Sequence, residues 1–580
     1  MNSTATSNNN PQTYSPGYQH LFSAERRPFL LVLILGIAIN LAGICTRFFT
    51  DDPGLYGLIA RNMVESGNFS NLVFQGTDWL DKPHFPFWMI AISFKLFGVN
   101  TVAYKLPALL FYFMSVVYTY KLGKKLYGIE TALIAVLVLL TAQHTIMSNT
   151  DVRAEPYIMG LLMGSVYHFY GLKEKFGWRD LLLGSLFAGC AVMTKGIYLL
   201  IPIGFAIIGD YIFKGDVKSL FRWRWVMAVV LTAIFVLPEI YTLYQQFDLH
   251  PEKIVFHRKG VSGIKWFLWD SQFGRFNSTG YIKRSDGSIF FFLHTLLWAF
   301  APWGILLYVA VFITIKKMVK RIALPEYVTI SGAGLMLLIF SISQFQLPFY
   351  TNILFPFFSI ITAVYIHSVI VKNKGKFFKI VQYAITGILV VAFIALNFVF
   401  SPERFVVFSL ITLGLVILAW YIYSKGQSVY YNLFLLTCCV AIWLNAYFIA
   451  IVYPTILRYK AEVLASDYVN QNYPGSTIVV VCEIPNAFPF YTQKRVYVTS
   501  ISEVLKTPVE RKSVILIDDI LAAQLKDQHI TYSVIKEFDN YPQENLTLPF
   551  IIEKERYKTF NHYFLIKFDP LPNKPSIPGA

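Results

Sequence analysis

The chain has 580 residues, of which 55% are hydrophobic, 17% aromatic and only 14% charged. A soluble globular protein carries about 25% charged residues, so this composition excludes a chain that covers itself with polar surface in water and indicates one dissolved in lipid. The net charge of +16 does not indicate nucleic-acid binding, because the lysines and arginines fall in short loops between apolar runs and form no basic surface with interleaved aromatic residues.

The N-terminal residues 1–27 are polar and end in a Glu-Arg-Arg triplet, and we expect them to form a cytoplasmic tail. The apolar run Pro28–Ile44 that follows is long for a signal-peptide core and lacks a clear small-residue cleavage site. It therefore predicts an uncleaved first membrane helix.

Apolar runs recur along residues 28–453 and predict a polytopic α-helical membrane domain with about 13 spanning helices. The runs cover residues 28–48, 103–120, 131–148, 156–171, 180–194, 197–213, 224–243, 291–315, 326–344, 350–371, 379–399, 405–423 and 428–453. With the N-terminus inside, the basic clusters at 121–125, 173–179, 214–224, 316–321 and 372–379 all fall on the inside. This agrees with the positive-inside rule, and the odd number of spans then predicts an outside C-terminus.

Two outside segments, residues 49–87 and 244–290, are longer than simple turns, and loops of this length are usually functional. In the first segment, residues 53–65 have the pattern of a helix that lies in the membrane interface. The apolar residues on one face of this expected helix are Leu55, Leu58, Ile59 and Met63.

The composition changes after Tyr453, and residues 454–580 predict a small extracytoplasmic α/β domain. We expect strands at 476–482, 513–517 and 562–568 and short helices at 501–505 and 520–526. Cys482 is the only cysteine in this part, so an internal disulfide is excluded, and none of the five cysteines has metal-ligand spacing.

Acidic residues directly follow the first predicted span, at Asp51 and Asp52. Asp52 before Pro53 suits a helix N-cap, which would explain it without chemistry. The alternative is a catalytic role for the pair at the membrane surface.

The segment Trp79–Trp88 places Lys82 and His84 among prolines and aromatic residues. One interpretation is an interfacial aromatic belt with a snorkelling lysine. The other is a rigid cationic site for a lipid phosphate, which lysine meets as a point charge.

Ionisable residues also gather at the outer ends of later spans. Asp151, Arg153 and Glu155 alternate before the fourth span, where three such groups are costly unless they pair or act. Lys195 departs from the positive-inside pattern and predicts either contact with an anion or an exposed turn.

Tyr350 begins the tenth span and could donate to a phosphate oxygen, or could belong to an aromatic belt. Polar groups without a clear motif occupy the second long outside segment and its end. They are His250, Glu252, His257, Arg258, Asp270, Arg275 and His294. Their spacing leaves a metal site possible but does not indicate one.

The order and membrane placement of these motifs resemble the GT-C glycosyltransferases, over the whole chain. The most similar branch includes the aminoarabinose transferases of lipid A and the protein O-mannosyltransferases. The matching positions are Asp51-Asp52, Asp81-Lys82-Pro83, Asp151-Val152-Arg153-Ala154-Glu155, Thr194-Lys195-Gly196 and Leu347-Pro348-Phe349-Tyr350. Gln346 stands where the family pattern often has lysine and Glu155 where it often has aspartate, so neither substrate is carried over from a relative.

The resemblance implies a transferase that moves a hexose or pentose from a polyprenyl-phosphate donor, with inversion. The acceptor would be a hydroxyl or phosphate of a lipid, glycan or protein on the outer face of the membrane. Asp51 would be the base, and Asp52 or Glu155 would orient the acceptor or the base. The cations expected at the donor phosphate are Lys82, Arg153 and Lys195, with Tyr350 as a further donor. No cofactor is required by this scheme, and a divalent metal stays open.

The resemblance also implies a bacterial inner membrane with the active site and the C-terminal domain on the extracytoplasmic side. A polytopic transporter or lipid flippase is the alternative, since it would also be apolar and basic inside. Transporters usually place ionisable residues near mid-span and often repeat their halves. Here the charges gather at the ends of spans, and the sequence has no evident repeat.

Overall fold

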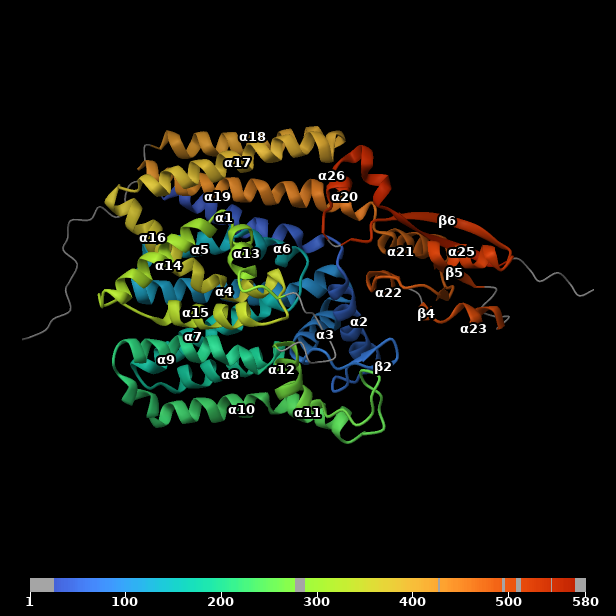
Figure 1. The fold of residues 1–580 in the computed structure, drawn as a ribbon, viewed down its shortest axis with the longest axis horizontal. Coiled ribbons are helices and arrows are strands. Elements are labelled where there is room, and N and C mark those ends of the chain that lie inside the picture. Colours follow the sequence, from blue (N-terminus) through green and yellow to red (C-terminus); the bar gives the residue numbers. More distant parts are fainter. Residues whose placement is uncertain are drawn as a thin grey trace, which may run out of the picture.

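The computed structural model of the chain describes residues 26–276, 287–425, 428–492, 496–506, 513–543 and 545–568. Long helices run side by side in a slab, and a small sheet lies at one end of it (Figure 1). The predicted mostly helical architecture is confirmed.

The slab is built from helices that overlap the predicted apolar runs. They are α1 (Arg27–Ala42), α4 (Thr101–Tyr127), α5 (Ile129–Leu140) with α6 (Gln143–Thr150), α7 (Glu155–Glu174), α8 (Trp178–Lys195), α9 (Leu200–Phe213), α10 (Trp223–Leu243), α13 (Phe291–Ala299) with α14 (Gly304–Val319), α15 (Val328–Ile342), α16 (Phe355–Lys372), α17 (Lys376–Phe400), α18 (Phe405–Ser424) and α19 (Val429–Tyr447). Seven of the described helices are long and apolar enough to cross a membrane, or eight if the bent pair α5–α6 is one span.

Burial explains why these helices need lipid. In α18 only 11% of the most apolar 18-residue window is buried, whereas in the span that contains α16 the share is 78%. A helix that is apolar on all sides yet uncovered by protein would be insoluble in water and is stable in a bilayer. Thus α16 belongs to the core of the slab, and α18 presents an apolar surface to its surroundings.

Between α1 and α4 the chain forms a separate layer near the sheet. It contains α2 (Asp51–Ser66), the hairpin of β1 (Val73–Phe74) and β2 (Thr77–Asp78), and α3 (Phe85–Phe97). The predicted helix at 53–65 is confirmed as α2, with Ile59 and Met63 buried. The capping role for Asp52 is wrong, because α2 begins at Asp51 and its N-cap residue is Thr50.

Helix α3 was not predicted, since residues 85–97 are not among the expected apolar runs. Pro86 lies in the first turn of α3, a position that proline tolerates because its missing N–H has no helical partner there. The described residues of the second long segment, 244–276 and 287–290, form short elements. They are the π-helical η4 (Tyr244–Asp248), α11 (Gly263–Lys265), the π-helical η5 (Trp266–Asp270) and α12 (Ser271–Phe276).

The C-terminal part contains a five-stranded sheet with the order β4-β3-β5-β7-β6. Its elements are α20 (Tyr453–Leu457), α21 (Ala461–Asn472), β3 (Ile478–Val480), α22 (Ala487–Tyr491), β4 (Val496–Val498), α23 (Ile501–Lys506), β5 (Val514–Asp518), α25 (Asp519–Asp527), β6 (Tyr532–Asn540), α26 (Leu548–Ile551) and β7 (Asn561–Phe568). Strands β4, β3 and β5 are parallel, and β7 is antiparallel to β5 and β6. The predicted strands and helices of this part are present, and β4 and β6 were missed.

Helices cover both faces of this sheet. One face packs on α21 and on Phe488 of α22, and the other packs on α23 and α25. The sheet is also fastened to the slab, because the Arg47 guanidinium donates to both carboxylate oxygens of Asp467 at 2.7 and 2.8 Å. The Phe48 N–H donates to the Tyr491 hydroxyl at 2.9 Å.

Candidate active site

One cavity of about 170 Å³ lies where α2, the loop before α3, the N-terminus of α7, the C-terminus of α8 and the segment before α16 meet. All predicted site residues except Asp51 line it. The lining residues are Asp52, Tyr56, Asp81, Lys82, Arg153, Ala154, Glu155, Lys195, Phe345, Leu347, Phe349 and Tyr350. The structure thus brings together motifs that lie almost 300 residues apart in the chain.

Charges in this cavity occur as three neighbouring pairs. Arg153 Nη1 lies 3.3 Å from Asp52 Oδ2. Lys195 pairs with Glu155, and Lys82 pairs with Asp81. Three cations and three carboxylates therefore balance, which is what a low-dielectric site requires before a ligand enters.

The Glu155–Lys195 pair is the most buried of the three, with side-chain exposures of 2% and 7%. Glu155 is in the first turn of α7 and Lys195 is in the last turn of α8. A helix dipole favours a carboxylate at the N-terminus and an ammonium at the C-terminus. The ends of α7 and α8 thus hold both charges in place.

Aromatic rings form one wall of the cavity. The Arg153 guanidinium lies 4.7 Å from the centre of the Phe349 ring, and Lys195 Nζ lies 4.5 Å from the centre of the Tyr350 ring. Such contacts stabilise a cation without neutralising it. The rings thus add a second favourable contact to two cations that are each paired with a carboxylate.

Tyr56 is a lining residue that the sequence analysis missed. It follows Asp52 by four residues on α2, a spacing that puts both side chains on one helix face and could have revealed it. Burial, followed by the negative charges of Asp52 and Asp81, raises the pKa of Tyr56 well above its usual value. The phenol is therefore a hydrogen-bond donor at neutral pH.

Asp51 lies outside this cavity. Its Oδ1 accepts from the Asn486 backbone N–H and its Oδ2 accepts from the Asn486 side-chain amide, both at 2.8 Å. Asp51 lines instead a larger cavity of about 780 Å³ between α2 and the C-terminal sheet. The two adjacent aspartates thus belong to different cavities.

His84 is a buried residue and not an interfacial one. Its Nδ1 lies 3.0 Å from Glu239 Oε1, its Nε2 lies 3.0 Å from the Ser70 carbonyl oxygen, and its backbone N–H donates to Glu239 Oε2 at 3.0 Å. His84 therefore anchors the loop that carries Lys82 to helix α10.

Asp151 and Gln346 also have structural contacts. Asp151 accepts a hydrogen bond from the Thr50 hydroxyl, which ties the start of α7 to the start of α2. The Gln346 amide donates to the Ser288 carbonyl oxygen at 3.0 Å and accepts from the Ser288 N–H at 2.9 Å. Gln346 is absent from the residues that line the cavity.

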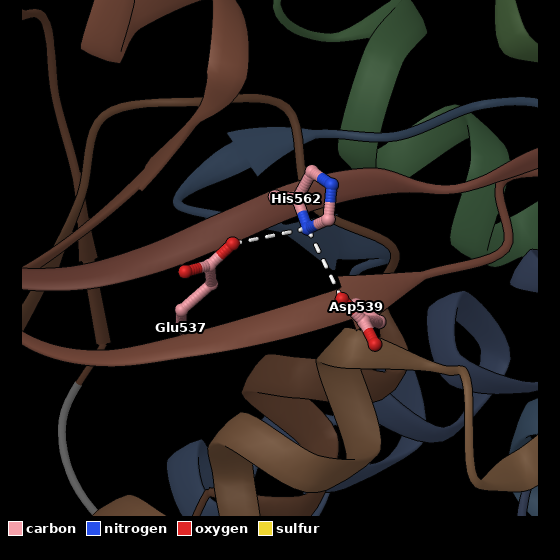
Figure 2. A group of neighbouring side chains, drawn as sticks. All are labelled: Glu537, Asp539 and His562. Atoms are coloured by element: carbon pink, nitrogen blue, oxygen red, sulfur yellow. Dashed lines mark ion pairs between the residues drawn. The ribbon is translucent and has the colours of Figure 1, made fainter. Parts of the chain in front are cut away.

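The polar groups of the second long segment do not assemble into a metal-ligand cluster within the described part of the chain. His250 and Glu252 form an exposed pair at 2.9 Å, and the side chain of Arg275 lies outside the described residues. The one described group with metal-ligand geometry lies on β6 and β7, where His562 Nδ1 is 3.2 Å from Glu537 Oε1 and 3.1 Å from Asp539 Oδ1 (Figure 2). This group lies at the surface of the paired strands β6 and β7 and lines neither cavity.

A third, largely apolar cavity of about 100 Å³ adjoins the first and shares Lys195, Phe345 and Tyr350 with it. Its other lining residues are Tyr198, Ser271, Gln272, Phe276, Met336, Ile339, Phe340 and Ser343. A charged cavity thus continues into an apolar one at Lys195, an arrangement that fits a ligand with an anionic head and an apolar chain.

Comparisons with known proteins agree with this arrangement. Residues 81–241 match the family model described as dolichyl-phosphate-mannose-protein mannosyltransferase. The chain is 24% identical over 444 residues to undecaprenyl phosphate-alpha-4-amino-4-deoxy-L-arabinose arabinosyl transferase 1 of Pseudomonas fluorescens, which covers 73% of each protein. It is also 24% identical over 399 residues to an uncharacterized protein of Aquifex aeolicus, covering 67% of this chain and 73% of that one.

Among solved structures, the chain is similar to ArnT from Cupriavidus metallidurans bound to undecaprenyl phosphate. The TM-score is 0.72 at 14% sequence identity, and the match covers 93% of this chain and 98% of that one. The oligosaccharyltransferase of Archaeoglobus fulgidus in the apo form matches with a TM-score of 0.50 at 11% identity, over 85% of this chain and 70% of that one. The resemblance to the GT-C glycosyltransferases of the aminoarabinose transferase branch is confirmed.

Proposed function

We propose that this chain, which has the fold of the aminoarabinose transferases, is a membrane glycosyltransferase that moves a sugar from a polyprenyl-phosphate donor to an acceptor on the outer face of the membrane. The observation that carries the proposal is the cavity of about 170 Å³ in which Lys82, Arg153 and Lys195 converge, which we call the cationic cavity after these residues. It lies beside an apolar cavity. The cations suit a phosphate, and the apolar side suits the first units of a polyprenyl chain.

The reaction is a single displacement at the anomeric carbon. The acceptor hydroxyl oxygen forms a bond to that carbon while the bond from the carbon to the phosphate oxygen breaks, which inverts the configuration. The hydroxyl proton goes to a carboxylate, and general-base help of this kind contributes about 10²–10⁴ in rate.

Asp52 is the base in this proposal, in place of Asp51. Asp52 lines the same cavity as the three cations, and 45% of its side chain is exposed. Asp51 accepts two hydrogen bonds from Asn486 and lines the other cavity. Proton transfer requires contact with the reacting hydroxyl, and Asp52 meets that condition better.

The leaving group is polyprenyl phosphate, whose negative charge grows as the bond to the sugar breaks. Lys82, Arg153 and Lys195 meet this charge, with Tyr350 and the protonated Tyr56 as neutral donors. Preorganised donors of this kind stabilise a transition state, and removing one typically costs about 10²–10³ in rate. Glu155 holds Lys195 in position and is a positioning residue in this scheme.

The proposed topology has 13 spans, a cytoplasmic N-terminal tail and a C-terminal α/β domain outside. Beyond the seven long apolar helices, it counts α5–α6 and α13–α14 as one span each and includes α7, α8 and the shorter helices α9 and α15. The basic loops then share the inner side, as the positive-inside rule requires. A bacterial inner membrane, with a lipid, glycan or protein as acceptor, is part of the same proposal.

The test is sugar transfer by the purified full chain in detergent, supplied with undecaprenyl-phosphate sugars and a lipid extract of the source membrane. We expect a glycosylated product by mass spectrometry and a loss of about 10²–10³ in rate for Lys82→Ala. Lys95→Ala is the matched control, because Lys95 is exposed at the end of α3 and lines none of the three cavities. Equal rates for both variants would overturn the phosphate site.

A further inference from the structure

The cavity of about 780 Å³ between α2 and the C-terminal sheet, which we call the crevice, has no role in the scheme above. It opens at the carboxyl ends of the parallel strands, where Val480, Val498 and Asp518 end β3, β4 and β5. Strand β3 lies between β4 and β5 in the sheet. The helix that connects β3 to β4, α22, packs on one face of the sheet, and the helix that connects β4 to β5, α23, packs on the opposite face. Open α/β sheets bind ligands at such a switch point.

The crevice is acidic. Asp51, Glu462, Glu483 and Asp518 line it, and Lys460 is the single cation among the described residues that line it. Its uncharged lining includes amides and aromatic rings, from Phe49, Phe74, Gln75, Asn486, Asn540, Asn561 and Tyr563. Carboxylates and amide oxygens accept hydrogen bonds from hydroxyl groups, whereas a phosphate entering here would be repelled.

The strongest evidence for a ligand in the crevice comes from Glu462. The residue is 2% exposed, and no donor among the described residues reaches its Oε2 atom. A buried carboxylate oxygen without a donor is costly, and burial raises the pKa of Glu462 above its usual value. A ligand hydroxyl or ammonium would supply the missing donor.

The crevice is also connected to the reaction. Asp51 lines the crevice and Asp52, the next residue, lines the cavity of the proposed donor. Asn486 holds Asp51 from the side of the sheet. An acceptor held in the crevice would therefore lie beside the first turn of α2, which carries Asp52.

We propose that the crevice binds the acceptor, and that the part it binds is a polyhydroxylated sugar without negative charge, either neutral or amine-bearing. This inference rests on the proposed glycosyl transfer and names its acceptor class. The four acidic residues that line the crevice exclude a phosphorylated or carboxylated headgroup from it. The phosphate of the donor stays in the cationic cavity.

The experiment measures binding of three matched probes to the purified full chain by saturation-transfer NMR: glucose, glucosamine and glucose 6-phosphate. We expect glucose and glucosamine to bind and glucose 6-phosphate to bind at least tenfold more weakly. Glu462→Gln and the exposed Glu483→Gln should each weaken glucosamine binding about tenfold or more. Glu537→Gln, on β6 and outside the crevice, is the matched control and should bind like the wild type.

Glucose 6-phosphate that binds as tightly as glucose, an absence of sugar binding by the wild type, or unchanged binding in both crevice variants would overturn the inference. Saturating undecaprenyl phosphate should leave probe binding intact, because it belongs in the other cavity. Sugar binding in a protein that transfers no sugar would instead refute the proposed function. Transfer by a protein whose crevice binds none of the probes would refute only this inference.

Discussion

Two neighbouring aspartates have different surroundings because they lie on a helix. Consecutive side chains on a helix point about 100° apart, so Asp51 faces the C-terminal sheet while Asp52 faces the cationic cavity. The sequence motif alone treats them as one acidic pair. The division of roles between them appears only when the sheet is docked on α2.

The Glu155–Lys195 pair should couple strongly in unfolding experiments. Lys195→Met leaves the buried Glu155 carboxylate without its cation, which typically costs about 3–5 kcal/mol. In the double variant Lys195→Met with Glu155→Gln no buried charge is left over, and we expect it to recover most of that loss. Thermal unfolding in detergent measures the cycle, and additive effects of the two single variants would contradict it.

Glu462 should make stability depend on pH. Its pKa is raised in the folded state by burial, so the native protein binds more protons than the unfolded one, and stability falls as pH rises from about 4.5 through the raised pKa. Glu462→Gln removes this dependence, and we expect a higher unfolding temperature than the wild type at pH 7.5 and little difference near pH 4.5. Parallel pH profiles for the two proteins would contradict the assignment.

Helix α2 joins the slab to the sheet by packing closely on α22. A Cβ added at Gly54 would lie 2.6 Å from the Asn486 carbonyl carbon, and one added at Gly57 would lie 2.6 Å from the Phe490 ring. The absence of these side chains is what lets the sheet approach Asp51. The close packing therefore builds the side of the crevice that contains Asp51 and Asn486.

Gly54→Ala should loosen this docking, because the new methyl group meets backbone atoms that cannot rotate away. We expect a loss of about 1–3 kcal/mol and faster tryptic cleavage at the exposed Arg458 between slab and sheet. Gly387→Ala is the matched control, since nothing lies within 4 Å of its added Cβ. Equal cleavage rates in the two variants would show that the contact does not hold the sheet.

Elements with a strong local signal could be predicted from the sequence, and those defined by tertiary contacts could not. The apolar runs, α2 and the buried strands β3, β5 and β7 carry clear periodicity or apolar continuity. Strand β4 is as short as β3 but has no buried residue, so it carries no apolar signal. Strand β6 is interrupted by an irregularity between Val534 and Lys536 that disturbs its alternation.

At the scale of the whole molecule, the cationic cavity was predictable because its residues are charges at the ends of apolar runs, where charge is costly and needs a reason. The crevice was not predictable. Asp51 and Asn486 are 435 residues apart, and each is an ordinary polar residue in its own segment. Only the docked sheet brings these residues together.

The proposed topology predicts the accessibility of two exposed lysines, Lys374 and Lys536. In a background with the native cysteines replaced by serine, Lys536→Cys should react with a membrane-impermeant maleimide in spheroplasts. Lys374→Cys should react only after permeabilisation, because it lies in a basic loop assigned to the inside. Labelling of both positions, or of Lys374→Cys alone, in intact spheroplasts would contradict the orientation.

The most direct test of the central claim is the rate of sugar transfer from undecaprenyl-phosphate sugars by the wild type, Asp52→Asn and Asp51→Asn, followed by mass spectrometry of the product. We expect Asp52→Asn to be folded and to lose about 10²–10⁴ in rate, while Asp51→Asn keeps a larger share of the activity. Near-normal transfer by Asp52→Asn would contradict the assignment of the base, and a folded wild-type protein that makes no product from any donor would contradict the glycosyltransferase itself.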